Sequence, residues 1–186
     1  MITFIALLRG INVGGKNIIK MTDLKRVFES IGLYDVKTYI QSGNVLFNSN
    51  EVEESLQIKI EHEIEAIFGF SVTAVLRTAE ELGKIISNCP FSKEEISEAE
   101  SSSGAESLYV ALLTHIPFQE KIKILNTYRD ESNEYRIVGR EVFLLFHNSI
   151  RNSKLANNLH KLDVTSTVRN WKTINKLAAL AKAMNS

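Results

Sequence analysis

The sequence predicts an α+β fold made of two ferredoxin-like β-α-β-β-α-β repeats, with mainly antiparallel sheet and helices packed on it. Three observations lead to this prediction. Short apolar runs rich in strand formers alternate with stretches whose apolar residues recur at helical spacing. Their order in the first half is the ferredoxin-like order. The second half then repeats the first, because residues 109–116 echo residues 4–11.

The first repeat, with one additional helix, is assigned to residues 1–91. Alternating or continuous apolar runs predict strands at 2–8, 36–40, 45–47 and 71–76. Apolar residues at helical spacing predict helices over 22–31 and 50–68. Thr22 is expected to cap the first helix, and Asn50 with Glu53 resembles a capping box for the second. Thr78 and Glu81 form a further capping box, for a helix that stops at Pro90.

A stretch rich in glutamate and serine, residues 92–107, is expected to be a mobile linker between the repeats. The second repeat, with a C-terminal helix, is assigned to 108–186. Its predicted strands are 109–116, 135–138, 141–146 and 165–169. Its predicted helices cover 118–128, 153–160 and the segment that begins near Trp171. The sequence leaves open whether the two repeats form separate sheets or share one core.

The ferredoxin-like order makes a spatial prediction for the first repeat. In that order the first and second strands run parallel, with the third strand between them. The loop after the first strand and the turn after the second strand therefore lie at the same edge of the sheet. We expect Gly10–Lys16 and Gln41–Asn44 to be neighbours in space. If the two repeats pack with these edges together, their cations line one cleft.

Composition limits the possible functions. The 186 residues include 22 basic and 22 acidic side chains. A net charge near zero argues against wholesale electrostatic binding to nucleic acid or to an anionic membrane, but it allows a local basic patch. The single cysteine, Cys89, excludes an internal disulfide and favours the cytoplasm. No signal peptide or membrane-spanning apolar run is found, so neither secretion nor membrane insertion is expected.

The glycine-rich loop between the first strand and the first helix has three interpretations. Gly10 and Gly15-Lys16 match most of a P-loop, but Asn17 replaces the hydroxyl that binds magnesium. A generic nest of backbone N–H groups would bind a phosphate or carboxylate, helped by Arg9 and Lys16. The third interpretation is a tight structural connection, and it is the one that the residues favour most.

Cations and turn residues supply the candidate ligand-binding set, because arginine forks and helix N-termini favour anions. Structural roles in turns, caps and local ion pairs remain open for each of them. The set comprises Arg9, Gly10, Asn12, Gly14, Gly15, Lys16, Ser42, Gly43, Asn44, Arg140, Ser153, Lys154, Arg169 and Asn170.

Signals of chemistry are sparse. The four histidines lack metal-ligand spacing, and no zinc motif or nucleophile elbow occurs, so no metal site is predicted and the cofactor is unknown. Cys89 and Trp171 are expected to pack in the interior. Glu141 is the carboxylate best placed to test as a base, although an ion pair with Arg140 is the favoured role. The catalytic residues and the oligomeric state are unknown.

Three functions remain in view. The favoured one is a cytoplasmic protein that binds a phosphate- or carboxylate-bearing small molecule. The second is a single-stranded nucleic-acid binding module, which would present aromatic side chains of the strands to bases. The residues in question are Tyr39, Phe47, Tyr135 and Phe143. The third is a structural or partner-binding protein without a ligand.

Several motifs together resemble one bacterial family, domain of unknown function 1697. They are the segments 8–16, 38–45, 139–142, 153–155 and 168–173, which occur in the family's order. The family more often has asparagine where this chain has Lys172. Because the family has no assigned activity, the resemblance implies a fold and a set of site residues but no reaction.

Overall fold

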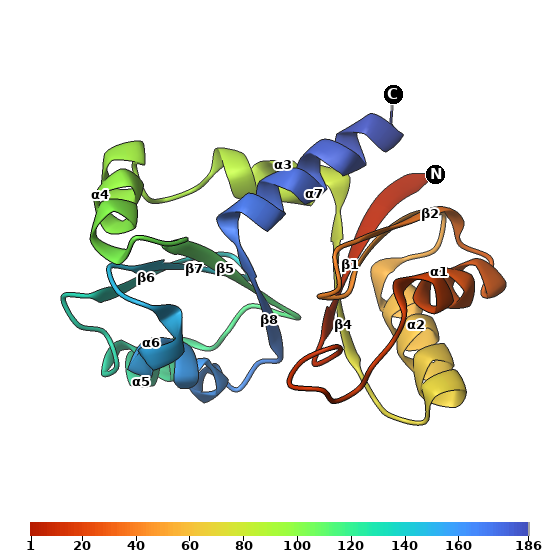
Figure 1. Ribbon diagram of the computed structural model, residues 1–186, viewed down its shortest axis with the longest axis horizontal. Coiled ribbons are helices and arrows are strands. Elements are labelled where there is room, and N and C mark those ends of the chain that lie inside the picture. Colours follow the sequence, from red (N-terminus) through yellow and green to blue (C-terminus); the bar gives the residue numbers. More distant parts are fainter. Residues whose placement is uncertain (186) are drawn as a thin grey trace. The chain divides into compact units, whose positions relative to one another are not determined.

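Two four-stranded antiparallel sheets organise the chain (Figure 1). The computed structural model describes residues 1–185, and the strand order is β2-β3-β1-β4 in one sheet and β6-β7-β5-β8 in the other. The strands are β1 (Ile2–Arg9), β2 (Tyr34–Tyr39), β3 (Asn44–Ser49), β4 (Thr73–Thr78), β5 (Leu108–Leu113), β6 (Asn133–Val138), β7 (Glu141–Phe146) and β8 (Ser166–Asn170). The predicted α+β class and the ferredoxin-like duplication are confirmed.

The helices occupy equivalent places in the two halves. In the first half they are α1 (Met21–Ser30), α2 (Glu53–Phe68) and α3 (Ala79–Ser87). In the second half they are α5 (Gln119–Asn126), α6 (Lys154–Asn157) and α7 (Trp171–Met184), with 3₁₀ turns Ile150–Asn152 and Leu159–Leu162 around α6. Helix α4 (Lys93–Ser103) lies between the two halves in sequence.

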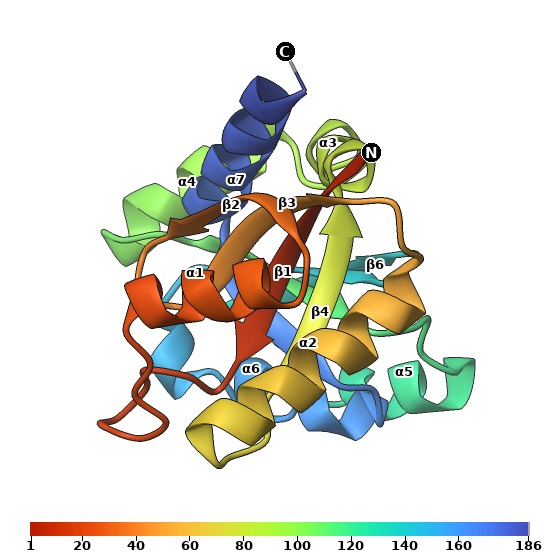
Figure 2. The ribbon, with the colours of Figure 1, turned by 90° about the vertical axis from the view of Figure 1, so that its right-hand side faces the viewer.

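The first core fills the space between one face of the first sheet and helices α1 and α2, which Figure 2 shows side by side on that face. Alternate residues of β1 point into it, as the period of a strand requires. The ring of Phe47 lies between two others, with centroid distances of 5.7 Å to Phe4 and 5.5 Å to Phe28. These contacts fix β1 and α1 on either side of the glycine-rich loop.

The second core repeats this arrangement with shorter helices. Apolar residues of β5 and β7 pack against α5, α6 and the following 3₁₀ turn. Tyr109 and Phe146 meet edge to face, with ring centroids 5.8 Å apart. The equivalence extends to hydrogen bonds, because Leu8 N donates to Gly43 O at 2.8 Å and Leu113 N donates to Arg140 O at 2.9 Å. Both bonds join the end of the first strand to the hairpin turn of the same repeat.

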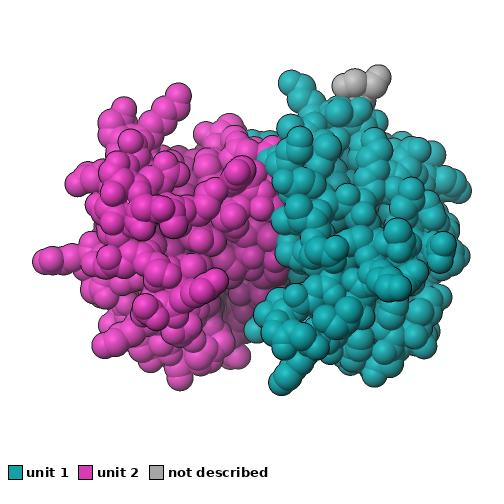
Figure 3. Space-filling view, in the orientation of Figure 1, with its two compact units in different colours: residues 1–83, 176–186 teal, residues 84–175 magenta. Residues whose placement is uncertain are grey.

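The chain divides into two compact units, which Figure 3 colours separately. Unit 1 comprises Met1–Gly83 with the chain from Lys176 onward, and unit 2 comprises Lys84–Asn175. The boundaries fall inside α3 and α7, whereas the sequence analysis placed them at residues 91 and 108. The last part of α7 therefore belongs to unit 1, although it follows the second repeat in sequence.

The segment expected to be a mobile linker contains helix α4. Ser92 caps it in a reciprocal capping box, since Ser92 Oγ accepts from Glu95 N at 3.1 Å and Glu95 Oε2 accepts from Ser92 N at 2.7 Å. Composition alone suggested a linker because serine and glutamate dominate the segment. The capping box was a signal for a helix that the composition concealed.

Two other predicted caps are wrong. Helix α1 starts at Met21 with Lys20 as N-cap, so Thr22 lies inside the helix. Helix α2 starts at Glu53 after Val52, so Asn50 does not cap it. The Thr78–Glu81 capping box is confirmed, with bonds of 2.8 and 3.1 Å between the two residues.

Candidate functional site

The glycine-rich loop is a small hairpin between β1 and α1. Asn12 N donates to Asn17 O at 3.1 Å, and Lys16 N donates to Val13 O at 3.1 Å. Gly14 and Gly15 take the two central positions with φ of 59° and 73°. Positive φ at both central residues defines a type I′ turn, which glycine adopts without strain. The type I′ turn therefore accounts for the paired glycines through local structure.

The P-loop interpretation does not fit this geometry. In a P-loop the helix begins at the lysine, so that its N–H groups cradle the phosphates. Here Lys16 lies within the hairpin, and α1 begins only at Met21. The loop is better described as a structural connection between β1 and α1 that carries exposed cations.

The side-chain amide of Asn12 ties the base of the hairpin to its surroundings. Its Nδ2 donates to Ile19 O at 3.0 Å and to Gln41 O at 2.9 Å, and its Oδ1 accepts from Ile19 N at 2.8 Å. Both amide hydrogens are thus in use inside the protein. The bond to Gln41 confirms that the loop and the β2–β3 turn are neighbours. Asn12 holds the frame of the site.

The β2–β3 turn is fitted closely against this loop. Gly43 has φ of 80°, and a Cβ added there would lie 2.7 Å from Cδ1 of Ile11. Asn44 is fully buried, and its Nδ2 donates to Tyr39 O at 3.0 Å and to Ser42 Oγ at 2.9 Å. Gly43 and Asn44 therefore shape the turn, and Ser42 takes part in the same network.

We define the loop edge as residues 9–20 together with residues 39–44. It carries three cations, Arg9, Lys16 and Lys20, and no aspartate or glutamate. All three side chains are exposed. Arg9 and Lys16 form no ion pair with any residue that the structure describes. The loop edge is therefore a local basic patch on a chain whose net charge is zero.

The candidates of unit 2 do not gather at one place. Arg140 lies in the β6–β7 turn, where its carbonyl accepts from Leu113 N. Asn170 pairs with Tyr109 at one end of β5, whereas Glu141, next to Arg140, pairs with Leu112 near the other end. Lys154 is the first residue of α6, which follows β7 in the chain.

Ser153 and Asn170 cap helices. Ser153 is buried, and its Oγ accepts from Ala156 N at 3.1 Å at the start of α6. The Oδ1 of Asn170 accepts from Thr173 N at 2.8 Å at the start of α7. These bonds give both residues structural roles.

Arg169 is buried in unit 2, with 9% of its surface exposed. Its Nη1 donates to Thr167 Oγ1 at 2.7 Å and to Val168 O at 3.0 Å. Burial lowers the pKa of Arg169 to about 10, so the guanidinium remains charged at neutral pH. These contacts favour a role inside the fold over contact with an external ligand.

Unit 1 contains an equivalent arginine that the sequence analysis missed. Arg77 pairs with Ile5 in the sheet, just as Arg169 pairs with Val110, and Ile5 and Val110 correspond in the repeat. Arg77 is fully buried, and its Nη1 donates to the carbonyl of the preceding Leu76 at 2.7 Å. Aligning the last strands of the two repeats would have revealed the pair.

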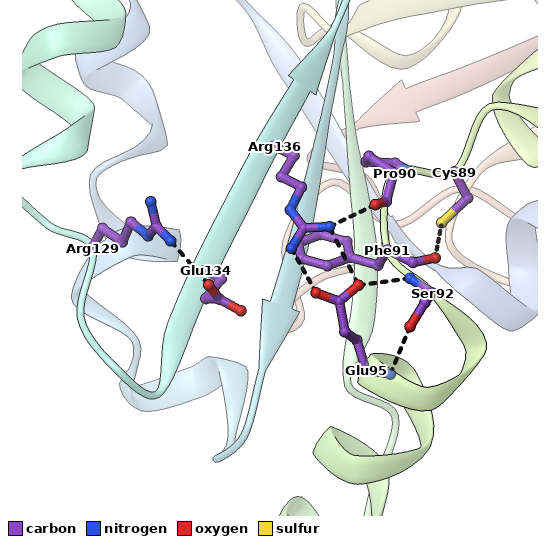
Figure 4. A network of polar contacts seen from close by, with 8 residues as sticks. All are labelled: Cys89, Pro90, Phe91, Ser92, Glu95, Arg129, Glu134 and Arg136. Carbon is purple, nitrogen blue, oxygen red and sulfur yellow. Dashed lines mark hydrogen bonds and ion pairs between the residues drawn. The ribbon is translucent and has the colours of Figure 1, made fainter.

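Arg136, also absent from the candidates, forms the main polar network of unit 2 (Figure 4). Its guanidinium binds the Glu95 carboxylate through two bonds, 2.6 and 3.3 Å, and donates to Pro90 O at 2.5 Å. It also lies 4.1 Å from the centroid of the Phe91 ring. The ion pair lowers the pKa of Glu95 and raises that of Arg136. The network joins α4 to β6, so its role is structural.

Other chemistry finds little support in residues 1–185. Cys89 is partly buried, and desolvation raises the pKa of its thiol, which disfavours the nucleophilic thiolate. Trp171 packs against Phe143, with ring centroids 6.3 Å apart. Within residues 1–185, no three His, Cys, Asp or Glu side chains gather closely enough to hold a metal ion. No helix in this range has the length and apolar character that crossing a bilayer requires.

Comparison with known proteins agrees with the fold. The profile of a protein family of unknown function, DUF1697, matches residues 1–143. The chain is similar in structure to the conserved bacterial protein SP0830 from Streptococcus pneumoniae, with a TM-score of 0.74 and 24% sequence identity. That similarity covers 97% of this chain and 98% of the other. No curated protein matches the sequence.

Proposed function

The chain belongs to the DUF1697 family, and we propose that it binds a phosphate- or carboxylate-bearing small molecule at the loop edge of unit 1. The observation that carries this proposal is the local charge. Three exposed cations lie within residues 9–20, and neither this segment nor the adjoining residues 39–44 contain a carboxylate. Exposed arginine and lysine side chains without acidic partners are suited to an incoming anion.

The position of α1 also favours a negatively charged ligand. The helix begins at Met21, directly after the loop edge, and none of the described side chains caps it. Its first turn carries one acidic residue, Asp23, which pairs with Arg26. The N-terminus of a helix carries a partial positive charge and presents N–H groups. Lys20 at the N-cap position adds its own charge. The helix end and the cations thus favour the same sign of ligand.

Hydrogen bonds within the protein hold the frame of the loop edge together. Asn12 links the hairpin, the segment before α1 and the β2–β3 turn through three hydrogen bonds. A preorganised surface loses less conformational entropy on binding. In this scheme Arg9 and Lys16 contact the anion, whereas Asn12, Gly43 and Asn44 hold the backbone. A cytoplasmic location fits the single cysteine and its lack of an internal disulfide.

Nucleic-acid binding has less support. Of the aromatic residues on the strands, Phe47 and Phe143 are buried in the interior, with 0% and 1% of their surface exposed. They cannot present their rings to unstacked bases. Tyr39 and Tyr135 are half-buried.

Calorimetric titration with inorganic pyrophosphate and with citrate tests the proposal, since these probes present phosphate and carboxylate charge. We expect saturable binding that falls at least about tenfold in the Arg9→Ala, Lys16→Ala variant, because charge-assisted hydrogen bonds contribute most of the affinity. The control is Lys161→Ala, Lys172→Ala, which removes the same charge from exposed positions in unit 2. Equal losses in both variants, or no binding of either probe, would overturn the proposal.

A further inference from the structure

The loop edge also exposes three β-branched aliphatic side chains. Val13 is 67% exposed, Ile18 62% and Ile40 48%. The cations alone would suffice for a small, strongly hydrated anion. Exposed branched side chains between them give the patch an apolar component that an inorganic anion cannot use.

The hydrogen bonds of Asn12 show that the backbone carrying these side chains lies in one neighbourhood. Its amide joins the backbone of Ile19 to that of Gln41. Ile18 precedes Ile19, Ile40 precedes Gln41, and Val13 follows Asn12 itself. The three aliphatic residues are therefore each one peptide away from groups that a single side chain connects.

The backbone of Ile40 supplies an independent observation. Its φ is 50°, in the left-handed region, where a β-branched residue is strained. An exposed turn position of this kind is normally filled by glycine or asparagine, which adopt it at little cost. Burial does not account for the isoleucine, because half of its surface is exposed. Strain retained at an exposed position points to a contact outside the fold.

We infer that the ligand of the loop edge is an anionic amphiphile, in which a phosphate or carboxylate head is joined to an aliphatic body. Arg9 and Lys16 bind the head, and Val13, Ile18 and Ile40 contact the body. This inference rests on the proposed anion site and names the class of ligand that the site takes. The same chemistry is available from a free alkyl phosphate and from a phospholipid in a bilayer.

The first test is a titration with inorganic phosphate, butyl phosphate and hexyl phosphate below their aggregation concentrations. A fully buried methylene strengthens binding about fourfold, so contact on one side is expected to give about twofold per methylene. Hexyl phosphate should then bind at least about fourfold more tightly than butyl phosphate. Equal affinities across the series would overturn the inference, and binding of inorganic phosphate would still support the anion site.

Two variants locate the gain from the alkyl chain. Val13→Ser, Ile18→Ser should remove most of the dependence on chain length and leave the affinity for inorganic phosphate unchanged. The matched control is Ile58→Ser on α2, which changes a side chain that is 69% exposed away from the loop edge. A chain-length gain that survives in full in the double variant, or that disappears in the control, would contradict the inference.

Ile40→Gly separates a ligand contact from a structural role. The substitution relieves the positive φ, so the protein should melt at the same or a higher temperature. It should nevertheless lose part of the gain from the alkyl chain. A variant that is less stable and keeps the full gain would show that Ile40 serves the fold alone.

Vesicles distinguish the two sources of the ligand. Sedimentation is compared between vesicles of phosphatidylcholine and vesicles that also contain phosphatidic acid. If the protein binds hexyl phosphate saturably but does not sediment with vesicles, the ligand is a free amphiphile. If the protein sediments with the vesicles that contain phosphatidic acid, and Val13→Ser, Ile18→Ser prevents this, the ligand is a lipid. If neither hexyl phosphate nor vesicles bind while pyrophosphate does, the inference fails and the proposed function stands. If none of the phosphate species and no citrate binds, both fail.

Discussion

A single amide, that of Asn12, holds together three segments of the loop edge. It satisfies backbone groups of Ile19 and Gln41 that the hairpin would otherwise leave to water. Asparagine is suited to this because its amide both donates and accepts. The residue looked like a ligand contact in the sequence, since polar residues in a glycine-rich loop suggest binding. Its partners lie far along the chain, so its structural role could not be derived from local pattern.

Asn12→Ala should lower the free energy of unfolding by about 2–3 kcal/mol, because three hydrogen bonds of about 1 kcal/mol each are lost. Urea denaturation measures the change. The control is Asn17→Ala, whose exposed Nδ2 donates a single bond of 3.0 Å to Gly10 O. Both residues have a positive φ, of 53° and 51°, so any strain of alanine there is common to the two variants, and Asn17→Ala should lose about 2 kcal/mol less than Asn12→Ala. Equal effects of the two substitutions would contradict the role assigned to Asn12.

Gly43→Ala tests the close fit of the β2–β3 turn. The new Cβ would meet Ile11 Cδ1 at 2.7 Å in addition to the strain of a positive φ. We expect a loss of about 2–5 kcal/mol in the free energy of unfolding, since strain contributes about 1–2 and overpacking about 1–3. Gly69→Ala is the control, with φ of +77° and no described atom within 4 Å of the added Cβ. It should lose about 1–2 kcal/mol.

At the scale of elements, the strands and the long helices could be predicted from the sequence, whereas the structure of the connections could not. Apolar periodicity located β1, α2 and the β2–β3 hairpin because burial imposes it directly. Helix α4 was missed because few of its residues are buried, Ala99 among them. Its position depends on the Ser92–Glu95 capping box and on Arg136 from β6. An attachment through polar side chains distant in sequence leaves no apolar pattern to find.

The attachment of α4 should depend on pH. Arg136 holds the pKa of Glu95 below its ordinary value of 4.5. A carboxyl group whose pKa is lower in the folded than in the unfolded state stabilises the fold fully when the pH is above its pKa in the unfolded state. This stabilisation is lost as the pH falls through its pKa in the folded state. We therefore expect the urea midpoint of the protein to fall below about pH 4.5 more steeply than that of Glu95→Gln. Between pH 6 and 8 the urea midpoints of the protein and of Glu95→Gln should change in parallel with pH. Parallel changes at acidic pH as well would contradict the prediction.

At the scale of the whole molecule, a balanced net charge makes the loop edge a local feature. With 22 cations and 22 acids, the chain has no overall field to attract anions over long distances. The duplication was evident from the apolar strands, since residues 109–116 echo residues 4–11. The gathering of ligand candidates was predictable within unit 1, because strand order alone placed the two loops together. In unit 2, Arg140 and Asn170 lie toward opposite ends of β5.

Binding of pyrophosphate should weaken as salt rises. The Debye length is about 10 Å at 0.1 M and about 3 Å at 1 M, so the exposed cations of the loop edge are progressively screened. We expect at least about a tenfold loss of affinity between 0.05 and 0.5 M sodium chloride, as calorimetry would measure it. The Arg9→Ala variant should show a shallower dependence. An affinity that does not change with salt would argue for a buried, uncharged mode of binding.

The most direct test of anion binding at the loop edge is a titration of ¹⁵N-labelled protein with hexyl phosphate, followed by amide chemical shifts. We expect the largest shifts to fall within residues 9–20 and 39–44 and to disappear in Arg9→Ala, Lys16→Ala. Asn12 and Gly43 amides should respond because they lie in the frame of the site. Shifts concentrated elsewhere, or unchanged in the double variant, would contradict the assignment of the site to the loop edge.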